Sequence, residues 1–274
     1  MQDLWVLGGD LRSARSCEQL RRNFPRVFSF GVPEQTDEPL PPSFDCVVLP
    51  FPSVCGALLR GTAAIPVEEV LHRVHGGTQV FGGLLGIWRE AMEARGATVY
   101  DLYGTEPMAT ANCVPTAEGA IALAITHSEI TLHGARCLVL GYGRVGKVLA
   151  ARLKALECAV TVGVRKQSDL ALAEAFGLET DETGVYRHGL RQYDFVFNTV
   201  PARVFSREQL AALSPDCLLL ELASAQAGIN ETDCQSLGLS YLFAPSLPAR
   251  FAPKTSGVLY ARGITAILRR EAEK

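Results

Sequence analysis

Three glycines in the stretch VLGYGRVG have the spacing of a dinucleotide-binding turn. Gly141, Gly143 and Gly146 follow the apolar run RCLVL and precede a helical pattern that reaches residue 156. The first glycine permits a tight turn, the second lets the backbone approach a pyrophosphate, and the third lets the helix pack on the strand. The phosphates would meet the helix N-terminus, which Arg144 and Val145 open. We predict that these five residues bind a dinucleotide.

Two cations end the next predicted strand, where many dinucleotide-binding domains carry a carboxylate. The run AVTVGV is followed by Arg165 and Lys166. A carboxylate would hold ribose hydroxyls and repel a 2′-phosphate, whereas Arg offers phosphate a forked pair of donors and Lys adds a second charge. Ser168 can donate one more hydrogen bond. The predicted cofactor is NADP rather than NAD, with solvated surface cations as the alternative.

Small residues follow two later strands of the same predicted domain. Thr199 and Pro201 come after FVFN, and Ala223 comes after CLLLEL. The carboxyl edge of such a sheet receives the nicotinamide half of the cofactor. We predict that these three residues contact it, with simple turn formation as the alternative for Ala223.

An earlier glycine turn, VLGGDLR, argues against a second nucleotide site. Its third glycine is missing, and Asp10 would lie where pyrophosphate charge must go. We interpret it as a structural or substrate-facing loop. The chain also has no histidine after His188, which disfavours dehydrogenases that use a late histidine on 2-hydroxy acids.

The elements that must position these residues alternate between short apolar runs and helical patterns throughout the chain. This order predicts an α/β fold with two Rossmann-like, doubly wound parallel sheets and an interdomain cleft. We expect a first domain over 1–108 with a returning C-terminal helix in 250–274, and an NADP-binding domain over 109–249. The connecting helix is expected to carry Pro115 in its first turn.

Composition excludes several other classes of function. The net charge of -3 gives no electrostatic case for nucleic acid or an anionic membrane. No apolar run reaches the roughly 20 residues of a membrane span, and the N-terminus lacks the pattern of a secretory signal. The eight cysteines include no CxxC pair, so no metal site is predicted and a reducing cytoplasm is expected.

Several segments, in order along nearly the whole chain, resemble the A subunits of dipicolinate synthases. The segments are VLGGDLR, VPTAEGAIALAITHSEITLHG at 114–134, VLGYGRVG, VGVRKQS, FNTVPARV, LELAS and LFAPSLPARFAPKTSG. The resemblance implies NADP-linked oxidation of dihydrodipicolinate, or its hydroxylated tetrahydro precursor, to dipicolinate. It also implies a role in the mother cell of a sporulating bacterium and, as partner, a flavoprotein-like B subunit. The family's Arg-Pro-Gly-Gly is replaced here by residues 225–228, and its Gly-Leu-Pro-Gly by residues 246–249.

A dicarboxylate substrate requires two anion sites and a proton acceptor. Arg12 and Lys254 are the candidates for the carboxylates, and Lys254 would add its charge to a helix N-terminus. Glu118 is the candidate proton acceptor, so the catalytic set is Glu118 and Lys254. The neutral substrate-binding candidates are Ser53, Gly82, Gly83 and Thr116. The alternatives are a solvated cation for Arg12 and a first-turn carboxylate for Glu118.

Two other functions remain open. One is an NADP-dependent cyclic imine or 2-hydroxy acid reductase that needs no partner. The other is a non-catalytic NADP-binding subunit that scaffolds or senses for a partner enzyme. A homo-oligomer is also left open by the sequence.

Overall fold

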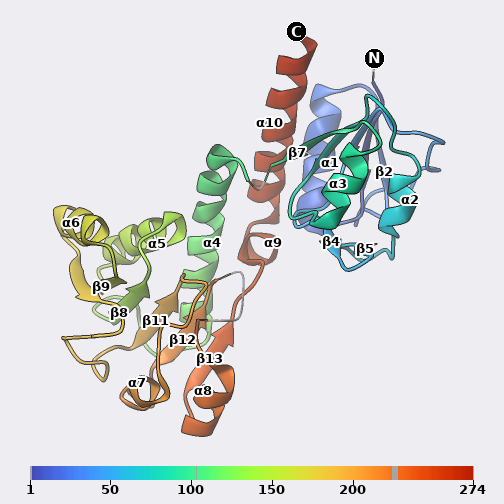
Figure 1. The fold of residues 1–274 in the computed structure, drawn as a ribbon. Helices are drawn as coiled ribbons and strands as arrows, with labels where there is room; N and C mark the ends of the chain where they lie inside the picture. Colours follow the sequence, from blue (N-terminus) through green and yellow to red (C-terminus); the bar gives the residue numbers. More distant parts are fainter. Residues whose placement is uncertain (1, 103, 224–227, 274) are drawn as a thin grey trace. The chain divides into compact units, whose positions relative to one another are not determined.

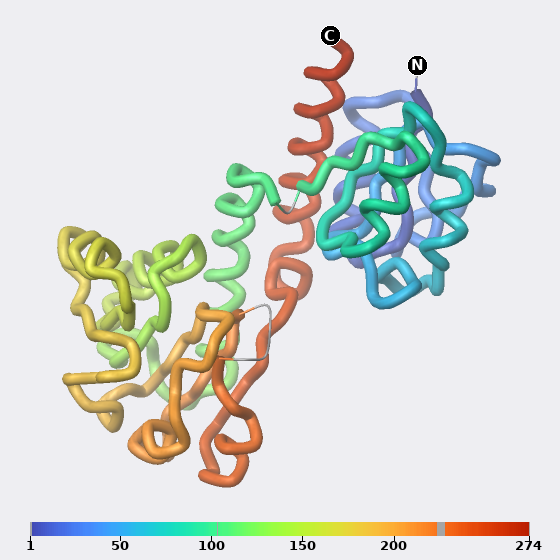
Figure 2. The backbone as a smooth tube through the Cα atoms, viewed as in Figure 1, coloured from blue at the N-terminus to red at the C-terminus, as the bar shows by residue number. Residues whose placement is uncertain are grey.

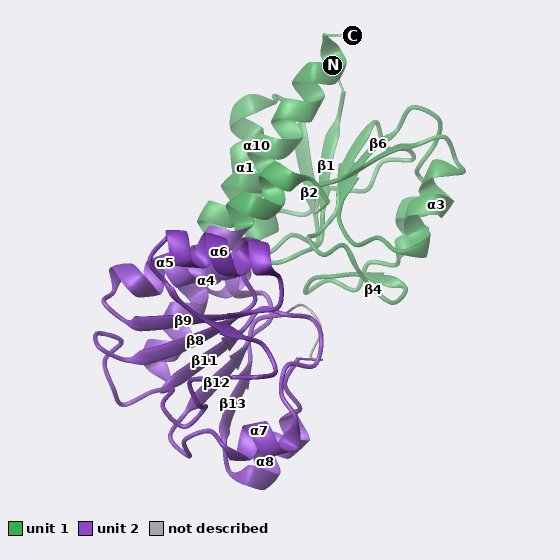
Figure 3. Ribbon diagram, turned by 60° about the vertical axis from the view of Figure 1, so that its left-hand side comes forward, with its two compact units in different colours: residues 1–112, 252–274 green, residues 113–251 purple. Residues whose placement is uncertain are grey.

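The chain forms two compact units, which Figure 3 colours separately. The computed structural model describes residues 2–102, 104–223 and 228–273. Unit 1 comprises Met1–Asn112 and Ala252–Lys274, and unit 2 comprises Cys113–Phe251. Each unit has its own parallel sheet with helices packed on both faces, so the predicted α/β class with two Rossmann-like sheets is confirmed.

Unit 1 is built on a five-stranded sheet in the order β2-β1-β3-β6-β7, with every pair parallel. Its strands are β1 (Leu4–Leu7), β2 (Val27–Phe30), β3 (Cys46–Val48), β6 (Gln79–Gly82) and β7 (Thr98–Asp101); β4 (Val54–Cys55) and β5 (Leu58–Leu59) form a separate hairpin. Its helices are α1 (Leu11–Asn23), α2 (Val67–Leu71), α3 (Ile87–Glu93) and α10 (Pro253–Ala272). The order of this sheet places a topological switch point between β1 and β3.

Alternate residues of β1 supply the two cores of unit 1. Leu4 and Val6 belong to the cluster under α1 and α10, whereas Trp5 and Leu7 belong to the cluster under α2 and α3. This is the period of two expected for a strand that is buried on both faces. The sheet of unit 1 is therefore an internal layer.

The last helix returns to unit 1, as the colours of Figure 2 show, and lies beside α1. A β-carbon on Gly257 would come within 2.5 Å of the carbonyl oxygen of Arg12 and within 2.7 Å of the β-carbon of Arg15. Only glycine lets the two helix backbones approach this closely. Gly257 thus fixes the start of α10 against the first turns of α1.

Unit 2 has a six-stranded parallel sheet in the order β10-β9-β8-β11-β12-β13 (Figure 1). The strands are β8 (Arg136–Leu140), β9 (Ala159–Val164), β10 (Glu179–Glu182), β11 (Phe195–Asn198), β12 (Leu218–Glu221) and β13 (Ser240–Phe243). The helices are α5 (Arg144–Ala155), α6 (Gln167–Ala175), α7 (Arg207–Ala211), α8 (Glu231–Leu237) and α9 (Leu247–Phe251), with most of α4 (Glu106–Thr126). This is the strand order of dinucleotide-binding domains, and its switch point lies between β8 and β11.

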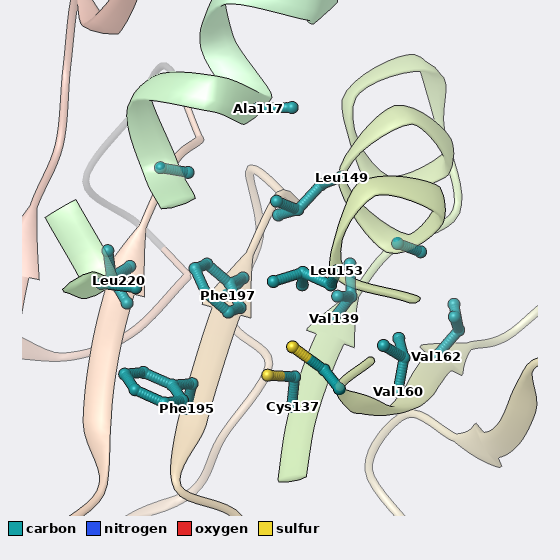
Figure 4. Packing of buried hydrophobic residues seen from close by; sticks show 14 of the residues in the cluster. Ala117, Cys137, Val139, Leu149, Leu153, Val160, Val162, Phe195, Phe197 and Leu220 are labelled. Carbon is teal, nitrogen blue, oxygen red and sulfur yellow. The ribbon is translucent and has the colours of Figure 1, made fainter. Parts of the chain in front are cut away.

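One face of this sheet packs against α4 and α5. Figure 4 shows Val139 of β8 and Phe197 of β11 meeting Leu149 and Leu153 of α5, with Ala117 of α4 nearby. All five side chains are fully buried. The cluster fixes α5 over the switch point and thereby orients the turn that precedes it.

The expectation for the connecting helix was wrong at its start. Pro115 was expected in the first turn, but α4 begins at Glu106 and contains Pro115 in its interior. A proline there has no N–H to donate to the carbonyl group of residue 111. The two units divide within this helix, between Asn112 and Cys113. The helix is therefore weakened next to the point where one unit ends and the other begins.

Helix α4 is also long and apolar enough to cross a membrane, if length and composition alone are considered. Ala117, Ala120 and Ala124 are nevertheless fully buried in the core of unit 2. A helix that serves as a core layer passes the same test, and packing explains the apolar composition of this one.

Candidate functional site

The three glycines of VLGYGRVG have three different structural roles at the carboxyl end of β8. Gly141 has φ +90°, and a β-carbon there would lie 2.6 Å from the hydroxyl oxygen of Thr199. A β-carbon on Gly146 would overlap the carbonyl oxygen of Gly141, whereas one on Gly143 would meet no atom within 4 Å. Gly141 and Gly146 thus allow the turn and helix to pack closely, and Gly143 leaves space into which a ligand can approach.

Helix α5 begins at this turn without a capping side chain. Gly143 is its N-cap residue and makes no side-chain hydrogen bond, and the first turn holds no acidic residue. The first N–H groups of a helix have no partner within the helix, and together with the macrodipole they favour an anion. The N-terminus of α5 and the open space at Gly143 therefore fit a phosphate group.

Arg165 and Lys166 lie at the same edge of the sheet. Parallel pairing sets Leu140 opposite Gly163, so β9 ends beside the glycine turn, and the two cations follow directly. Both are exposed, as is Ser168 in the first turn of α6. Within the described part of the chain, neither cation forms a hydrogen bond or ion pair through its side chain. Their charges remain available to a phosphate.

The predicted nicotinamide-edge residues differ in their surroundings. Thr199 donates its hydroxyl to the carbonyl oxygen of Leu140 at 2.8 Å, so it joins β11 to β8 at the switch point. Pro201 is exposed in the loop that follows, and Ala223 is buried directly after β12. The altered segment noted in the sequence falls largely outside the described residues, because 225–227 belong to the stretch 224–227 that the structure does not describe.

A buried acid–amide pair, which the sequence analysis did not identify, lies beneath these two loops. Asn198 ends β11 and Glu221 ends β12, and the two are direct neighbours in the parallel register. Both are fully buried, and Asn198 Nδ2 donates to both carboxylate oxygens at 2.8 and 2.9 Å. Burial raises the pKa of the Glu221 carboxyl, and the hydrogen bond from Asn198 partly opposes that effect.

A polar residue at the end of each of two apolar strands was the available sequence signal. The runs FVFN and CLLLE each end on a group that needs hydrogen-bond partners if it is buried. Their pairing was not predictable, because it depends on the register of two strands whose residues are 23 positions apart.

The first glycine turn in unit 1 surrounds a buried ion pair. Arg12 is buried, and its Nε and Nη2 donate to the two carboxylate oxygens of Asp10 at 3.0 and 2.7 Å. Its Nη1 also donates to the hydroxyl oxygen of Tyr260 at 3.3 Å. Asp10 accepts the N–H of Arg12 as well and so caps α1. A substrate carboxylate at Arg12 would have to share this guanidinium with Asp10.

The structure brings Ser53, Gly82 and Gly83 together at the carboxyl ends of β3 and β6. Ser53 is fully buried, and its hydroxyl accepts the N–H of Gly83 at 2.9 Å while donating to the carbonyl oxygen of Pro50. A β-carbon on Gly82 would lie 2.7 Å from the Ser53 hydroxyl oxygen. These residues tie two loops together, and the Ser53 hydroxyl is already occupied by protein partners.

The remaining predicted substrate and catalytic residues are divided between the units. Lys254 is exposed in the first turn of α10 and belongs to unit 1. Thr116 and Glu118 lie on α4 within unit 2, and Glu118 forms an ion pair with Arg152 at 3.5 Å. Glu118 is exposed, whereas Thr116 is half-buried. No contact within either unit joins Lys254 to Glu118 among the described residues.

Cysteines and metal-binding groups form no second centre in the described part of the chain. Seven cysteines, including Cys113, are buried, and Cys55 is exposed. Burial raises the pKa of Cys46 and Cys217 to about 12, which keeps both thiols protonated. Among the described residues, no three His, Cys, Asp or Glu side chains gather into a metal-binding group.

Comparison with known proteins confirms the resemblance inferred from the sequence. No family model matches the chain. The A subunit of dipicolinate synthase from Bacillus subtilis (strain 168) is 29% identical over 280 residues, which cover 96% of this chain and 94% of that protein. The crystal structure of the A subunit of dipicolinate synthase from Bacillus halodurans has a TM-score of 0.87 and 26% identity, with 97% of both chains covered.

More distant structures share the fold alone. A transhydrogenase from Sinorhizobium meliloti has a TM-score of 0.68 and 14% identity, with 98% of this chain and 94% of that chain covered. A phosphoglycerate oxidoreductase from Vibrio cholerae o395 has a TM-score of 0.64 and 13% identity, with both chains fully covered. The two-sheet architecture is thus one that dehydrogenases use.

Proposed function

We propose, with the full-length similarity to the A subunit of dipicolinate synthase as the premise, that this chain is an NADP-dependent oxidoreductase that forms dipicolinate. The substrate would be dihydrodipicolinate or its hydroxylated tetrahydro precursor. One observation carries the cofactor part of the proposal: the glycine turn at the switch point opens an uncapped helix, and two cations without protein partners among the described residues follow the adjacent strand.

The residues of the glycine turn fit the diphosphate of a dinucleotide. Gly143 would let the backbone approach, and the first N–H groups of α5, from Arg144 and Val145 onward, would donate to the phosphate oxygens. Thr199, Pro201 and Ala223 would border the nicotinamide half at the carboxyl ends of β11 and β12.

The choice of NADP over NAD follows from Arg165, Lys166 and Ser168. Arg and Lys would neutralise a 2′-phosphate, and the Ser168 hydroxyl would add a hydrogen bond near the N-terminus of α6. The phosphate would gain partners without displacing any existing ion pair of these two cations. NAD would leave both positive charges without a counterion.

The bound cofactor would accept a hydride from the substrate, so that dihydrodipicolinate and NADP⁺ give dipicolinate, NADPH and a proton. Formation of an aromatic ring drives this two-electron oxidation. Glu118 would accept the proton, and Lys254 would attract a substrate carboxylate. Arg12 would contribute to carboxylate binding only by sharing its fork with Asp10. Ser53, Gly82, Gly83 and Thr116 would provide the surrounding neutral donors.

Similarity to one component of a synthase that is named by its subunits also supports a partner. We propose that this partner is a flavoprotein-like second subunit. We further propose that the chain acts in the cytoplasm of a sporulating mother cell. Neither the partner nor the location is needed for the cofactor prediction, which concerns unit 2 by itself.

Two measurements test this function. Calorimetry should give a lower Kd for NADPH than for NADH, and Arg165→Ala should remove most of that preference. Arg191→Ala is the matched control, because Arg191 is an exposed cation of the same unit that precedes the amino end of β11. Equal affinities for the two cofactors in the unaltered protein would contradict the assignment of NADP.

The reaction is tested by oxidation of dihydrodipicolinate with and without the partner protein. Activity of this chain alone would exclude a scaffold. Activity only on cyclic imines or 2-hydroxy acids would replace dipicolinate by a different substrate class. Binding of NADPH without any turnover, even with the partner present, would show that the chain is non-catalytic.

A further inference from the structure

The carboxylate of Glu221 is buried without a cationic partner among the described residues. Its side chain is fully inaccessible, and the group that reaches both of its oxygens is the neutral amide of Asn198. A buried charge without a counterion is costly unless hydrogen bonds compensate for the loss of water. The hydrogen bonds that Glu221 accepts therefore indicate what the carboxylate is for.

Those hydrogen bonds come from the loop that follows β12. Glu221 Oε1 accepts the N–H of Ala223 at 3.2 Å, and Oε2 accepts the N–H of Ile229 at 2.9 Å. Ala223 lies where the loop leaves the strand, and Ile229 lies where it leads into α8. One carboxylate thus fixes both ends of the 223–229 loop.

The amide of Asn198 extends this arrangement to the loop after β11. Asn198 Oδ1 accepts the N–H of Val200 at 3.0 Å, and Asn198 Nδ2 donates to the carbonyl oxygen of Val200 at 3.0 Å. A β-carbon on Gly228 would overlap Asn198 Nδ2 and lie 2.7 Å from Glu221 Oε2. The two loops therefore share one closely packed set of polar contacts.

The same contacts continue to the glycine turn. A β-carbon on Gly141 would lie 2.6 Å from the Thr199 hydroxyl oxygen and 2.9 Å from a methyl carbon of Val200. The loop that Asn198 fixes is thus the loop against which the phosphate-binding turn packs. A change in the backbone at Val200 would be transmitted to both halves of the cofactor site.

We propose that Glu221 is a positioning residue, which acts through Asn198 to fix the 199–201 and 223–229 backbone against which the nicotinamide half of the cofactor binds. This inference rests on the proposed nucleotide-dependent function. It assigns no proton transfer to Glu221, which contacts protein groups on all the sides that the structure describes.

Glu221→Gln is the direct test, because the amide keeps the size of the side chain but replaces one acceptor by a donor. That donor would face the amide of Asn198 or a backbone N–H, so the loops would have to move. The probes are NADPH and 2′,5′-ADP, which carries the adenosine half without the nicotinamide. We expect Kd for NADPH to rise about tenfold and Kd for 2′,5′-ADP to change less than about twofold.

Glu182→Gln is the matched control, since Glu182 ends β10 of the same sheet and is exposed. It should change neither affinity. Should Glu221→Gln not fold, as judged by circular dichroism, Asn198→Ala removes the link to Val200 and should give the same selective loss for NADPH.

Three outcomes are distinguishable. Parallel loss of affinity for both probes would overturn the positioning role and leave general stability as the function of Glu221. Unchanged affinity for both probes would overturn it as well. If the unaltered protein binds neither NADPH nor NADH, the proposed nucleotide-dependent function itself is wrong, and this inference falls with it.

Discussion

The carbonyl oxygen of Gly141 occupies the space that a β-carbon on Gly146 would need. The first and third glycines of the motif are therefore in direct contact across the turn, and neither position tolerates a side chain without movement of the backbone. Gly143, between them, faces open space. The motif thus separates two requirements, close packing of the helix and access for a ligand.

Substitution of these glycines should separate the two requirements. Gly146→Ala is expected to destabilise unit 2 by about 1–3 kcal/mol through overpacking and to abolish NADPH binding. Gly143→Ala should leave the free energy of unfolding within about 0.5 kcal/mol, because φ is -76° and the space is open, yet it should weaken NADPH binding at least about tenfold. Urea unfolding followed by circular dichroism, together with calorimetry, checks both. Tight NADPH binding by Gly146→Ala would contradict this assignment of the turn.

The Asp10–Arg12 pair should contribute to the stability of unit 1. Asp10→Ala leaves the buried guanidinium without its carboxylate and removes the cap of α1. Because Asp10 itself is 44% exposed, we expect a loss of about 2 kcal/mol rather than that of a fully buried pair. Both tryptophans, Trp5 and Trp88, belong to unit 1, so the fluorescence change on urea unfolding reports this unit.

Arg15→Ala is a suitable control, since its ion pairs with Glu18 and Glu34 are more exposed. It should cost less than about 1 kcal/mol. If Asp10→Ala is as stable as the unaltered protein, the pair does not anchor unit 1. Arg12 would then be free to serve mainly as a substrate ligand.

Glu118 offers a test of the proposed proton acceptor with little structural interference. The side chains of Glu118 and Arg152 are 59% and 34% exposed, so their ion pair should contribute less than about 1 kcal/mol. Glu118→Gln should lower kcat for dihydrodipicolinate oxidation about 100-fold while stability is retained. Arg152→Gln, which keeps the carboxylate, should lower kcat far less. An equal, small effect of both substitutions would mean that the pair is only a surface contact.

The stability of unit 2 should depend on pH through Glu221. Burial raises the pKa of this carboxyl above its ordinary value, so the folded protein holds the proton more tightly than the unfolded chain does. Between the ordinary and the raised pKa, the free energy of unfolding should therefore fall as pH rises, relative to Glu221→Gln. The contribution is complete below the ordinary pKa and is lost above the raised one.

This prediction is checked by urea unfolding of the unaltered protein and of Glu221→Gln across an acidic-to-neutral pH series. The difference between the two free energies isolates Glu221 from other carboxylates. A difference that grows more favourable to the unaltered protein as pH rises would have the opposite sign and would contradict the raised pKa.

Local patterns determined much of the nucleotide-binding part of unit 2. The turn from β8 into α5 and the cations after β9 depend on residues that are close in sequence, and the spacing of three glycines is sufficient to specify the turn. The helix α6 was likewise expected near residues 168–176 and is observed at Gln167–Ala175. In contrast, β10 was not expected, because ETDE contains no apolar residue and forms a strand only through pairing with β9 at the sheet edge.

Contacts between distant residues were decided by the tertiary structure alone. Arg12 seemed available for substrate in the sequence, yet α10 and Tyr260 enclose it together with Asp10. The start of α4 was misplaced because Pro115 is typical of a first turn, while packing of the alanines beyond it sustains the helix on both sides of the proline. Glu221 and Asn198 meet only because β11 and β12 pair in parallel at one register. Residue types and spacing specify a turn whose partners are neighbours in the chain, but they do not specify which buried polar groups face each other, because that depends on how strands and helices pack.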